Sequence, residues 1–343
     1  MIKKYLAILL VALIGCFCVA CGGVDVQSPE RPQYVFSPKE NVVDDRQYYT
    51  GIEEIRFPDT LWSAPLYERA NEYDRPSQGV QAYFLQSVGY NGAPTHVFAF
   101  VGIPATATKE HPVPGVVLVH GGGGTAFSDW VKLWNDRGYA AIAIDTEGRI
   151  PLESASLHCE SNVSTESIKH HGPTNTSYRD DCAKPAEEQY LYHAIAATIV
   201  ANSFLSSFEQ VDGSKIGLTG ISWGGVISTN TAAYDDRFAF VAPVYGAVAM
   251  TGTAGKFGTL YNTYPRAAFL WDNVEMLRDC RTPILFVNWE GDPFFEVGAT
   301  EKCAATAING RMILIPNLNH GHRQGANVQE IFTFADSVIG RGN

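Results

Sequence analysis

Short, fully apolar segments recur from about residue 80 onward and alternate with longer segments of helical periodicity. Continuous apolar runs are typical of strands that are covered on both faces of a sheet. Alternation of such strands with helices predicts a mostly parallel sheet with helices on both faces. The predicted strands are 115–119, 140–144, 215–219, 238–244, 284–287 and 312–315. The predicted helices are 127–137, 186–208, 225–234, 297–308 and 328–339.

Two aromatic and β-branched runs precede this alternating region. They cover residues 80–88 and 96–103, and Asn91-Gly92 lies between them. Because an Asn-Gly pair fits the tight turns of hairpins, we expect these runs to form an antiparallel pair.

The first twenty residues have the pattern of a secretory signal segment. Lys3 and Lys4 precede an uncharged apolar run over 6–14, which is shorter than the roughly 20 residues of a spanning helix. Two segments at its end resemble a bacterial lipobox, residues 13–16 and, more loosely, residues 18–21. Cys21 is the predicted lipidated residue, and Cys16 is the alternative. Cleavage at Cys21 leaves an even number of cysteines for an oxidising compartment. We therefore expect an exported lipoprotein, periplasmic or on the outer surface, held to the membrane by its lipid anchor only.

Composition narrows the class of protein further. The 343-residue chain has 45% hydrophobic, 12% aromatic and 18% charged residues, which excludes a disordered chain. Its formal net charge of −11 argues against nucleic acid as a partner. We expect a signal peptide over 1–20, a tether and N-terminal arm over 21–77, and one α/β domain over 78–343. Two stretches, at about 146–184 and 247–265, fit neither pattern and are predicted to be insertions after strands, where ligand sites of such sheets form.

A glycine-flanked serine follows the predicted strand 215–219 and precedes a predicted helix. Gly220-Ile221-Ser222-Trp223-Gly224 has the G-x-S-x-G spacing of a nucleophile elbow, which projects a serine from a sharp turn between strand and helix. We therefore predict Ser222 as a catalytic nucleophile.

A serine nucleophile needs a base and an acid that orients the base. In elbow enzymes the acid and then the histidine follow the serine along the chain. Asp292 lies just past the strand 284–287, and His320 lies just past the last strand. We predict Asp292 as the acid, with Glu290 as its rival, and His320 as the base, with His322 as the alternative.

The oxyanion of such a reaction needs backbone N–H donors. One is predicted to be the amide of Trp223, directly after the nucleophile. The other is expected from the loop His120-Gly121-Gly122-Gly123-Gly124, through Gly122 and Gly123. This loop lacks the lysine of a P-loop and the spaced glycines of a dinucleotide fingerprint.

Together these motifs resemble the α/β-hydrolase superfamily. The likeness is greatest to the bacterial acetyl xylan esterase, cephalosporin deacetylase and dienelactone hydrolase group, and the catalytic domain of the prolyl oligopeptidase family is also similar. It extends from about Gln78 to the C-terminus and rests on residues 120–124, 220–225, 235–238, 292 and 320. The resemblance implies an α/β-hydrolase fold and a serine hydrolase.

The predicted function is that of a lipid-anchored serine esterase that removes an acyl group from a carbohydrate or small ester through an acyl-enzyme. An aminopeptidase-like amide hydrolase and a catalytically silent binding lipoprotein remain as alternatives. We expect a small-molecule or glycan ester as substrate, no nucleic acid, no cofactor and no metal site. The sequence leaves the oligomeric state open.

The insertion over 146–184 is predicted to cover the site. A disulfide between Cys159 and Cys182 would hold it, and Cys280 and Cys303 could form a second, although four cysteines allow three pairings. Its candidates for substrate contact are His158, His170, His171 and Tyr178.

Overall fold

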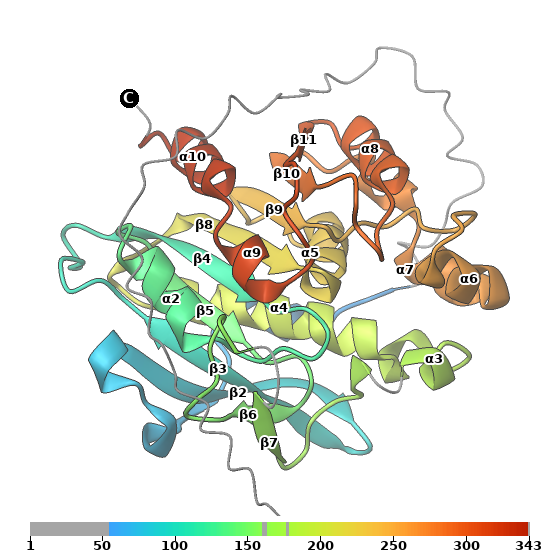
Figure 1. The fold of residues 1–343 in the computed structure, drawn as a ribbon. Coiled ribbons are helices and arrows are strands. Elements are labelled where there is room, and N and C mark those ends of the chain that lie inside the picture. The colour runs from blue at the N-terminus through green and yellow to red at the C-terminus, as the bar shows by residue number, and fades with distance from the viewer. Residues whose placement is uncertain (1–54, 160–162, 176–177, 342–343) are drawn as a thin grey trace, which may run out of the picture. The chain divides into compact units, whose positions relative to one another are not determined.

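A nine-stranded mixed sheet runs through the part of the chain that the structure, a computed structural model, describes: residues 55–159, 163–175 and 178–341 (Figure 1). Its strand order is β1-β2-β3-β5-β4-β8-β9-β10-β11. The strands from β1 to β5 pair antiparallel, and those from β5 to β11 pair parallel. The predicted α/β-hydrolase fold is thus confirmed, whereas the predicted signal segment and Cys16 and Cys21 lie outside the described residues.

Each apolar run of the alternating region forms a strand of this sheet. The strands are β1 (Tyr67–Arg69), β2 (Val80–Tyr90), β3 (Ala93–Gly102), β4 (Val113–Val119), β5 (Ala140–Ile144), β8 (Val211–Ile221), β9 (Phe240–Val244), β10 (Ile284–Asn288) and β11 (Gly310–Leu314).

The predicted hairpin is β2–β3, with Tyr90 opposite Ala93 and positive φ angles of 50° at Asn91 and 79° at Gly92. Both turn residues therefore adopt the left-handed backbone that makes Asn-Gly favourable there.

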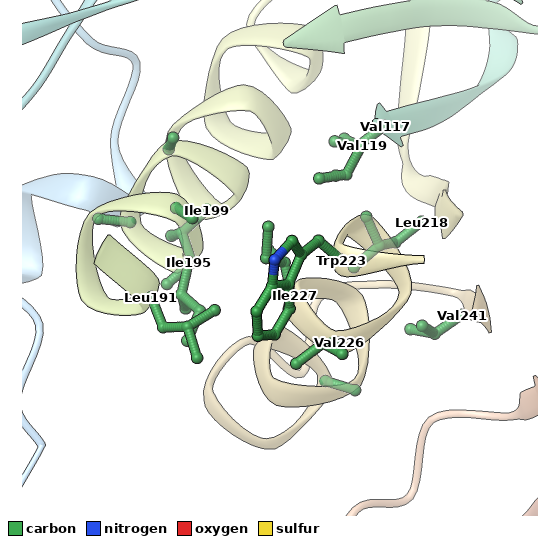
Figure 2. Packing of buried hydrophobic residues seen from close by; sticks show 14 of the residues in the cluster. Val117, Val119, Leu191, Ile195, Ile199, Leu218, Trp223, Val226, Ile227 and Val241 are labelled. Carbon is green, nitrogen blue, oxygen red and sulfur yellow. The ribbon is translucent and has the colours of Figure 1, made fainter. Parts of the chain in front are cut away.

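Helices cover both faces of the sheet, as the fully apolar strands require. Along β4, the side chains of Val117 and Val119 belong to one core layer, and those of Val116 and Leu118 belong to the other. The first layer lies against α4 (Tyr190–Ser206), α5 (Trp223–Tyr234) and α8 (Val297–Thr306), and the second against α2 (Ser128–Asn135) and α10 (Gln329–Val338). Figure 2 shows the first layer, where side chains of α4 and α5 pack beside those of β4 and β8.

The helix α4 is buried on almost all sides, since sixteen of its seventeen residues are buried. A helix that is apolar all round must be covered on its outer face as well as against the sheet. The segment at the start of the described chain supplies this cover: Phe57 stacks on Tyr192 at 4.6 Å between ring centroids, and the Tyr192 hydroxyl donates to Arg56 O at 2.9 Å. Across the described residues, no helix has both the length and the apolar character needed to span a membrane.

Both predicted insertions contain secondary structure that the sequence pattern does not reveal. The first holds a two-stranded sheet of β6 (Arg149–Pro151) and β7 (Ser164–Ser167) and the short helix α3 (Tyr178–Asp181). The second holds α6 (Lys256–Thr263), and α7 (Pro265–Trp271) begins at its predicted end and extends beyond it. These elements are too short to establish a clear period of apolar residues, and α7 begins at a proline.

The predicted disulfides are wrong, because the described cysteines form no disulfide bond. Cys159 is exposed, whereas Cys182 is buried and its thiol donates to Tyr178 O at 3.1 Å. The thiols of Cys280 and Cys303 point to different parts of the fold, toward Ala232 O at 3.2 Å and Val248 O at 3.3 Å. Burial raises the pKa of Cys303 to about 12, so its thiol stays protonated.

The buried His193 of α4 gives a testable contribution to acid sensitivity. Burial lowers its pKa from 6.5 to about 4, and its Nε2–H donates to Glu187 O at 2.9 Å. The unfolded chain therefore binds this proton first, so the stability that the neutral imidazole gives is complete above about pH 6.5 and is lost as the pH falls toward 4. Between about pH 7 and pH 5, we expect the free energy of unfolding to fall by about 2 kcal/mol more in the wild type than in His193→Gln.

Urea unfolding at the two pH values measures this difference. His111→Gln serves as the control, because His111 is exposed. An equal pH dependence in the wild type and in His193→Gln would contradict the prediction.

Candidate active site

Ser222 lies on the turn between β8 and α5 with the backbone of a nucleophile elbow. Its φ of 57° and ψ of −117° are strained for a residue other than glycine, and its amide donates to Val244 O at 2.9 Å. A Cβ on Gly224 would lie 2.0 Å from Val119 O, so glycine at this position lets α5 begin directly against β4. The G-x-S-x-G motif thus serves the close packing that its spacing predicts.

A continuous series of hydrogen bonds joins three of the residues selected from the sequence. His320 Nε2 lies 2.8 Å from Ser222 Oγ, and His320 Nδ1 lies 2.7 Å from Asp292 Oδ2. Asp292 follows β10, His320 follows β11 and Ser222 follows β8, so three loops at the carboxyl ends of parallel strands meet here. The arrangement has the geometry in which a histidine can take a proton from a serine.

The carboxylate of Asp292 is held by several donors. Its side chain is only 1% exposed, and Oδ1 accepts from the amides of Phe294 at 2.9 Å and Phe295 at 2.8 Å. The indole Nε1 of Trp289 donates to Oδ2 at 3.1 Å. The rival acid, Glu290, is exposed and is not part of this network within the described residues.

Tyr245, at the end of β9, supports the histidine loop and was not selected from the sequence. Its ring lies 4.4 Å from that of His320 between centroids, and its hydroxyl donates to Gly321 O and accepts from Gly321 N. The backbone of Tyr245 has a positive φ of 32°. Its position directly after a buried strand was the one available signal, and that position is shared by many residues that only pack.

His322, the alternative base, faces a different partner. At the start of α9 (His322–Ala326), its Nε2 accepts a hydrogen bond from Gly121 N at 3.0 Å. Burial, helped by the neighbouring His120 and His320, lowers the pKa of His322 to about 4. The imidazole is therefore neutral near pH 7 and holds the glycine loop rather than Ser222.

The glycine loop passes directly beside the nucleophile. A Cβ on Gly121 would lie 2.7 Å from Ile221 O and 2.9 Å from Ser222 Cβ, so this position has no room for a side chain. His120 holds the loop from the other side, with Nδ1–H donating to Gly121 O at 2.7 Å and Nε2 accepting from Thr146 N at 2.9 Å.

The predicted oxyanion donors face the same cavity as the nucleophile. Gly122, Gly123 and Trp223 line this cavity together with Ser222 and His320. Trp223 is the first residue of α5, where backbone amides have no carbonyl partner within the helix. These residues therefore lie beside Ser222 in the cavity wall, and their role as oxyanion donors stays a prediction.

The cavity has a volume of about 640 Å³, within the usual range for a small-molecule site. Apolar parts of its wall come from Trp223, Phe257, Leu260 and Phe294. Its other lining residues are Glu147, Arg149, Asn175, Tyr178, Arg179 and Lys256, besides the glycines and catalytic candidates.

Of the four contact candidates in the first insertion, Tyr178 lines the cavity, whereas His158, His170 and His171 are not among its described lining residues. The sequence did not single out the charged lining residues, because isolated charges in an insertion carry no period or motif.

A mostly parallel sheet, a strained serine elbow and a Ser–His–Asp series at the strand ends together define a serine hydrolase of the α/β-hydrolase fold. The comparison with known families makes this more specific. The chain belongs to the acetyl xylan esterase family, whose model matches residues 61–250, and it is a serine carboxylic ester hydrolase. The model of the prolyl oligopeptidase family also matches, over residues 194–341.

Solved structures of esterases share this fold. The acetyl xylan esterase from Paenibacillus sp. R4 is 18% identical, with a TM-score of 0.59 over 87% of this chain and 95% of that chain. Acetyl xylan esterase 1 from Thermoanaerobacterium sp. JW/SL YS485 is 17% identical, with a TM-score of 0.58 over 86% and 93%. The glucuronoyl esterase from Solibacter usitatus is 12% identical, with a TM-score of 0.54 over 83% and 87%.

Proposed function

We propose that the protein removes an acyl group, acetyl in the first instance, from a carbohydrate or small ester through a covalent acyl-enzyme. The observation that carries this proposal is the hydrogen-bonded series Ser222–His320–Asp292, of which Ser222 and His320 line the cavity. Membership of the acetyl xylan esterase family supports an acetyl ester as the substrate.

In the proposed reaction, Ser222 Oγ attacks the ester carbonyl carbon while its proton passes to His320 Nε2, 2.8 Å away. The tetrahedral intermediate then expels the alcohol, which takes this proton, and the acyl group remains on Ser222. A water molecule gives its proton to His320 and attacks the acyl-enzyme, which releases the acid and restores the serine. Asp292 accepts from His320 Nδ1–H, which selects the required tautomer and stabilises the imidazolium.

The negative charge that forms on the carbonyl oxygen would be met by backbone amides. Trp223 supplies one from the start of α5, and Gly122 and Gly123 supply the other from the glycine loop. Each such donor typically contributes about 10²–10³ in kcat. Because His322 and His120 both hold the loop by hydrogen bonds, these donors are positioned before the substrate binds.

We further propose export and membrane attachment through a lipid on Cys21, with Cys16 as the alternative site. The support is the sequence pattern alone: a short positive segment, an apolar run and a cysteine at its end. The enzyme would then act outside the cytoplasm and reach its substrate from a tether over the first part of 21–77.

Trapping the acyl-enzyme tests the proposed function. After 4-nitrophenyl acetate is mixed with the protein and the reaction is quenched in acid, mass spectrometry should find one acetyl group on the peptide that contains Ser222. The same spectra report the lipid, expected on an N-terminal Cys21. Acetylation of another residue in place of Ser222 would overturn the mechanism.

Amide hydrolysis is the second candidate, favoured by the match of the prolyl oligopeptidase model over residues 194–341. A dipeptide 4-nitroanilide in place of the ester decides between them. Acylation by the ester alone supports the esterase, efficient acylation by the anilide supports the amide hydrolase, and acylation by neither supports a silent binding protein.

A further inference from the structure

Three basic side chains line the cavity that contains Ser222 and His320, and the only acid among its described lining residues is Glu147. Arg149 belongs to β6 and Arg179 to α3, both in the first insertion, whereas Lys256 belongs to α6 in the second. The positive charge is thus supplied by the two insertions rather than by the strands that carry the candidate catalytic residues. It also opposes the sign of the whole chain, whose formal net charge is −11.

Within the described residues, none of these three cations forms an ion pair, although other surface cations do. Lys109, for example, lies 2.7 Å from Glu209, and Lys184 lies 2.6 Å from Asp181. Lys256 is in addition the first residue of α6, where the positive end of the helix dipole disfavours a cation. All three residues are exposed and line one concave surface, where their like charges repel one another unless an anion lies between them.

The backbone that carries Arg149 is held in place by a buried carboxyl group. Asp145, fully buried after β5, accepts from the amides of Glu147 and Arg149, each at 2.9 Å. Glu147 is itself engaged, since its Oε2 accepts from Asn175 N at 3.1 Å. Burial raises the pKa of the Glu147 carboxyl, whereas the nearby Arg149 and the hydrogen bond from Asn175 N act in the opposite direction.

From this arrangement we propose that the substrate is an ester that carries a carboxylate beside the scissile bond, with an acylated acidic carbohydrate as the preferred class. Arg149, Arg179 and Lys256 bind that carboxylate and hold the ester carbonyl over Ser222. This inference rests on the proposed esterase function and names its substrate class. In an acidic protein, a positive cavity also raises the local concentration of an anionic substrate.

Matched ester pairs test the proposal. 4-Acetoxybenzoate and 4-acetoxybenzamide differ by a carboxylate on the alcohol side of the ester. The 4-nitrophenyl monoester of adipic acid and 4-nitrophenyl hexanoate differ by a carboxylate on the acyl side. We expect kcat/KM for 4-acetoxybenzoate to exceed that for its amide by about tenfold at low salt, and this ratio to fall as the ionic strength rises.

Variants that replace the three cations by glutamine test whether these residues cause the preference for anionic esters. Arg149→Gln, Arg179→Gln and Lys256→Gln should each lower the anion-to-neutral ratio by about twofold to fivefold, and the triple variant by about tenfold. Arg311→Gln is the matched control, because Arg311 is exposed on β11 and is not part of the cavity wall. It should leave the ratio unchanged.

The outcomes separate this inference from the proposed function. If no ester is hydrolysed through Ser222, the proposed function fails first. If neutral esters are hydrolysed but neither anionic ester is preferred, or if the preference survives in the triple variant, the inference alone is overturned. A preference confined to the adipate pair would retain the carboxylate but move it to the acyl side, which would overturn the acidic carbohydrate as the substrate class.

Discussion

Replacing Ser222 by alanine is expected to lower kcat for 4-nitrophenyl acetate by about five to six orders of magnitude. The reason is that the hydrogen-bonded series ends on Ser222 Oγ, 2.8 Å from His320 Nε2, so the variant lacks the atom that would form the acyl-enzyme. The remaining rate would come from binding and from the oxyanion donors acting on a water molecule. Initial rates over a range of ester concentrations measure the effect.

The Ser222→Ala variant should remain folded. The substitution removes no packing contact from the hydrophobic core. The elbow backbone is held by the hydrogen bond from Ser222 N to Val244 O, which the variant keeps. Thermal unfolding of both proteins provides the check. Ser214→Ala, at an exposed position in β8, is the matched control and should retain full activity. Turnover by Ser222→Ala at the wild-type rate would exclude the serine mechanism.

The sheet and the candidate catalytic residues could be predicted because each has a strong local signal. The apolar runs of β4 and β5 have no polar interruptions, and a strand buried on both faces is the arrangement that hides them fully. The elbow motif identifies Ser222 by its spacing. The order of serine, acid and histidine along the chain then selects Asp292 and His320, each of which lies just past a predicted strand. Each of these signals spans only a few neighbouring residues.

The residues of the cavity wall have no such local signal in the sequence. Arg149, Arg179 and Lys256 come from separate short elements, and they line one cavity because these elements follow β5 and β9, which end at the same edge of the sheet. The hydrogen-bonding role of Tyr245 on Gly321 likewise depends on contacts between loops. The cysteine pairing failed for a related reason, since an even number of cysteines says nothing about whether their thiols face each other.

The two histidines of the last loop should differ strongly when each is replaced by alanine. His320→Ala is expected to lower kcat by about five to six orders of magnitude, because it removes the group that contacts both Ser222 and Asp292. His322→Ala should lower kcat by about 10²-fold, because it frees Gly121 N and loosens the glycine loop without removing a donor from the cavity. Steady-state kinetics of the two variants with one ester measure the contrast.

A positioning role for His322 makes a prediction that a purely structural role does not. The amide oxygen of glutamine can accept the hydrogen bond from Gly121 N, so His322→Gln should recover part of the activity lost in His322→Ala. Glutamine at position 320 cannot exchange a proton with Ser222 and should give no recovery. A proton-transfer role for His322 would predict the opposite pattern, with both His322 variants inactive and His320→Ala still active. The pKa of about 4 that burial gives His322 already disfavours that pattern, because such a weak base gains little by taking a proton from serine near pH 7.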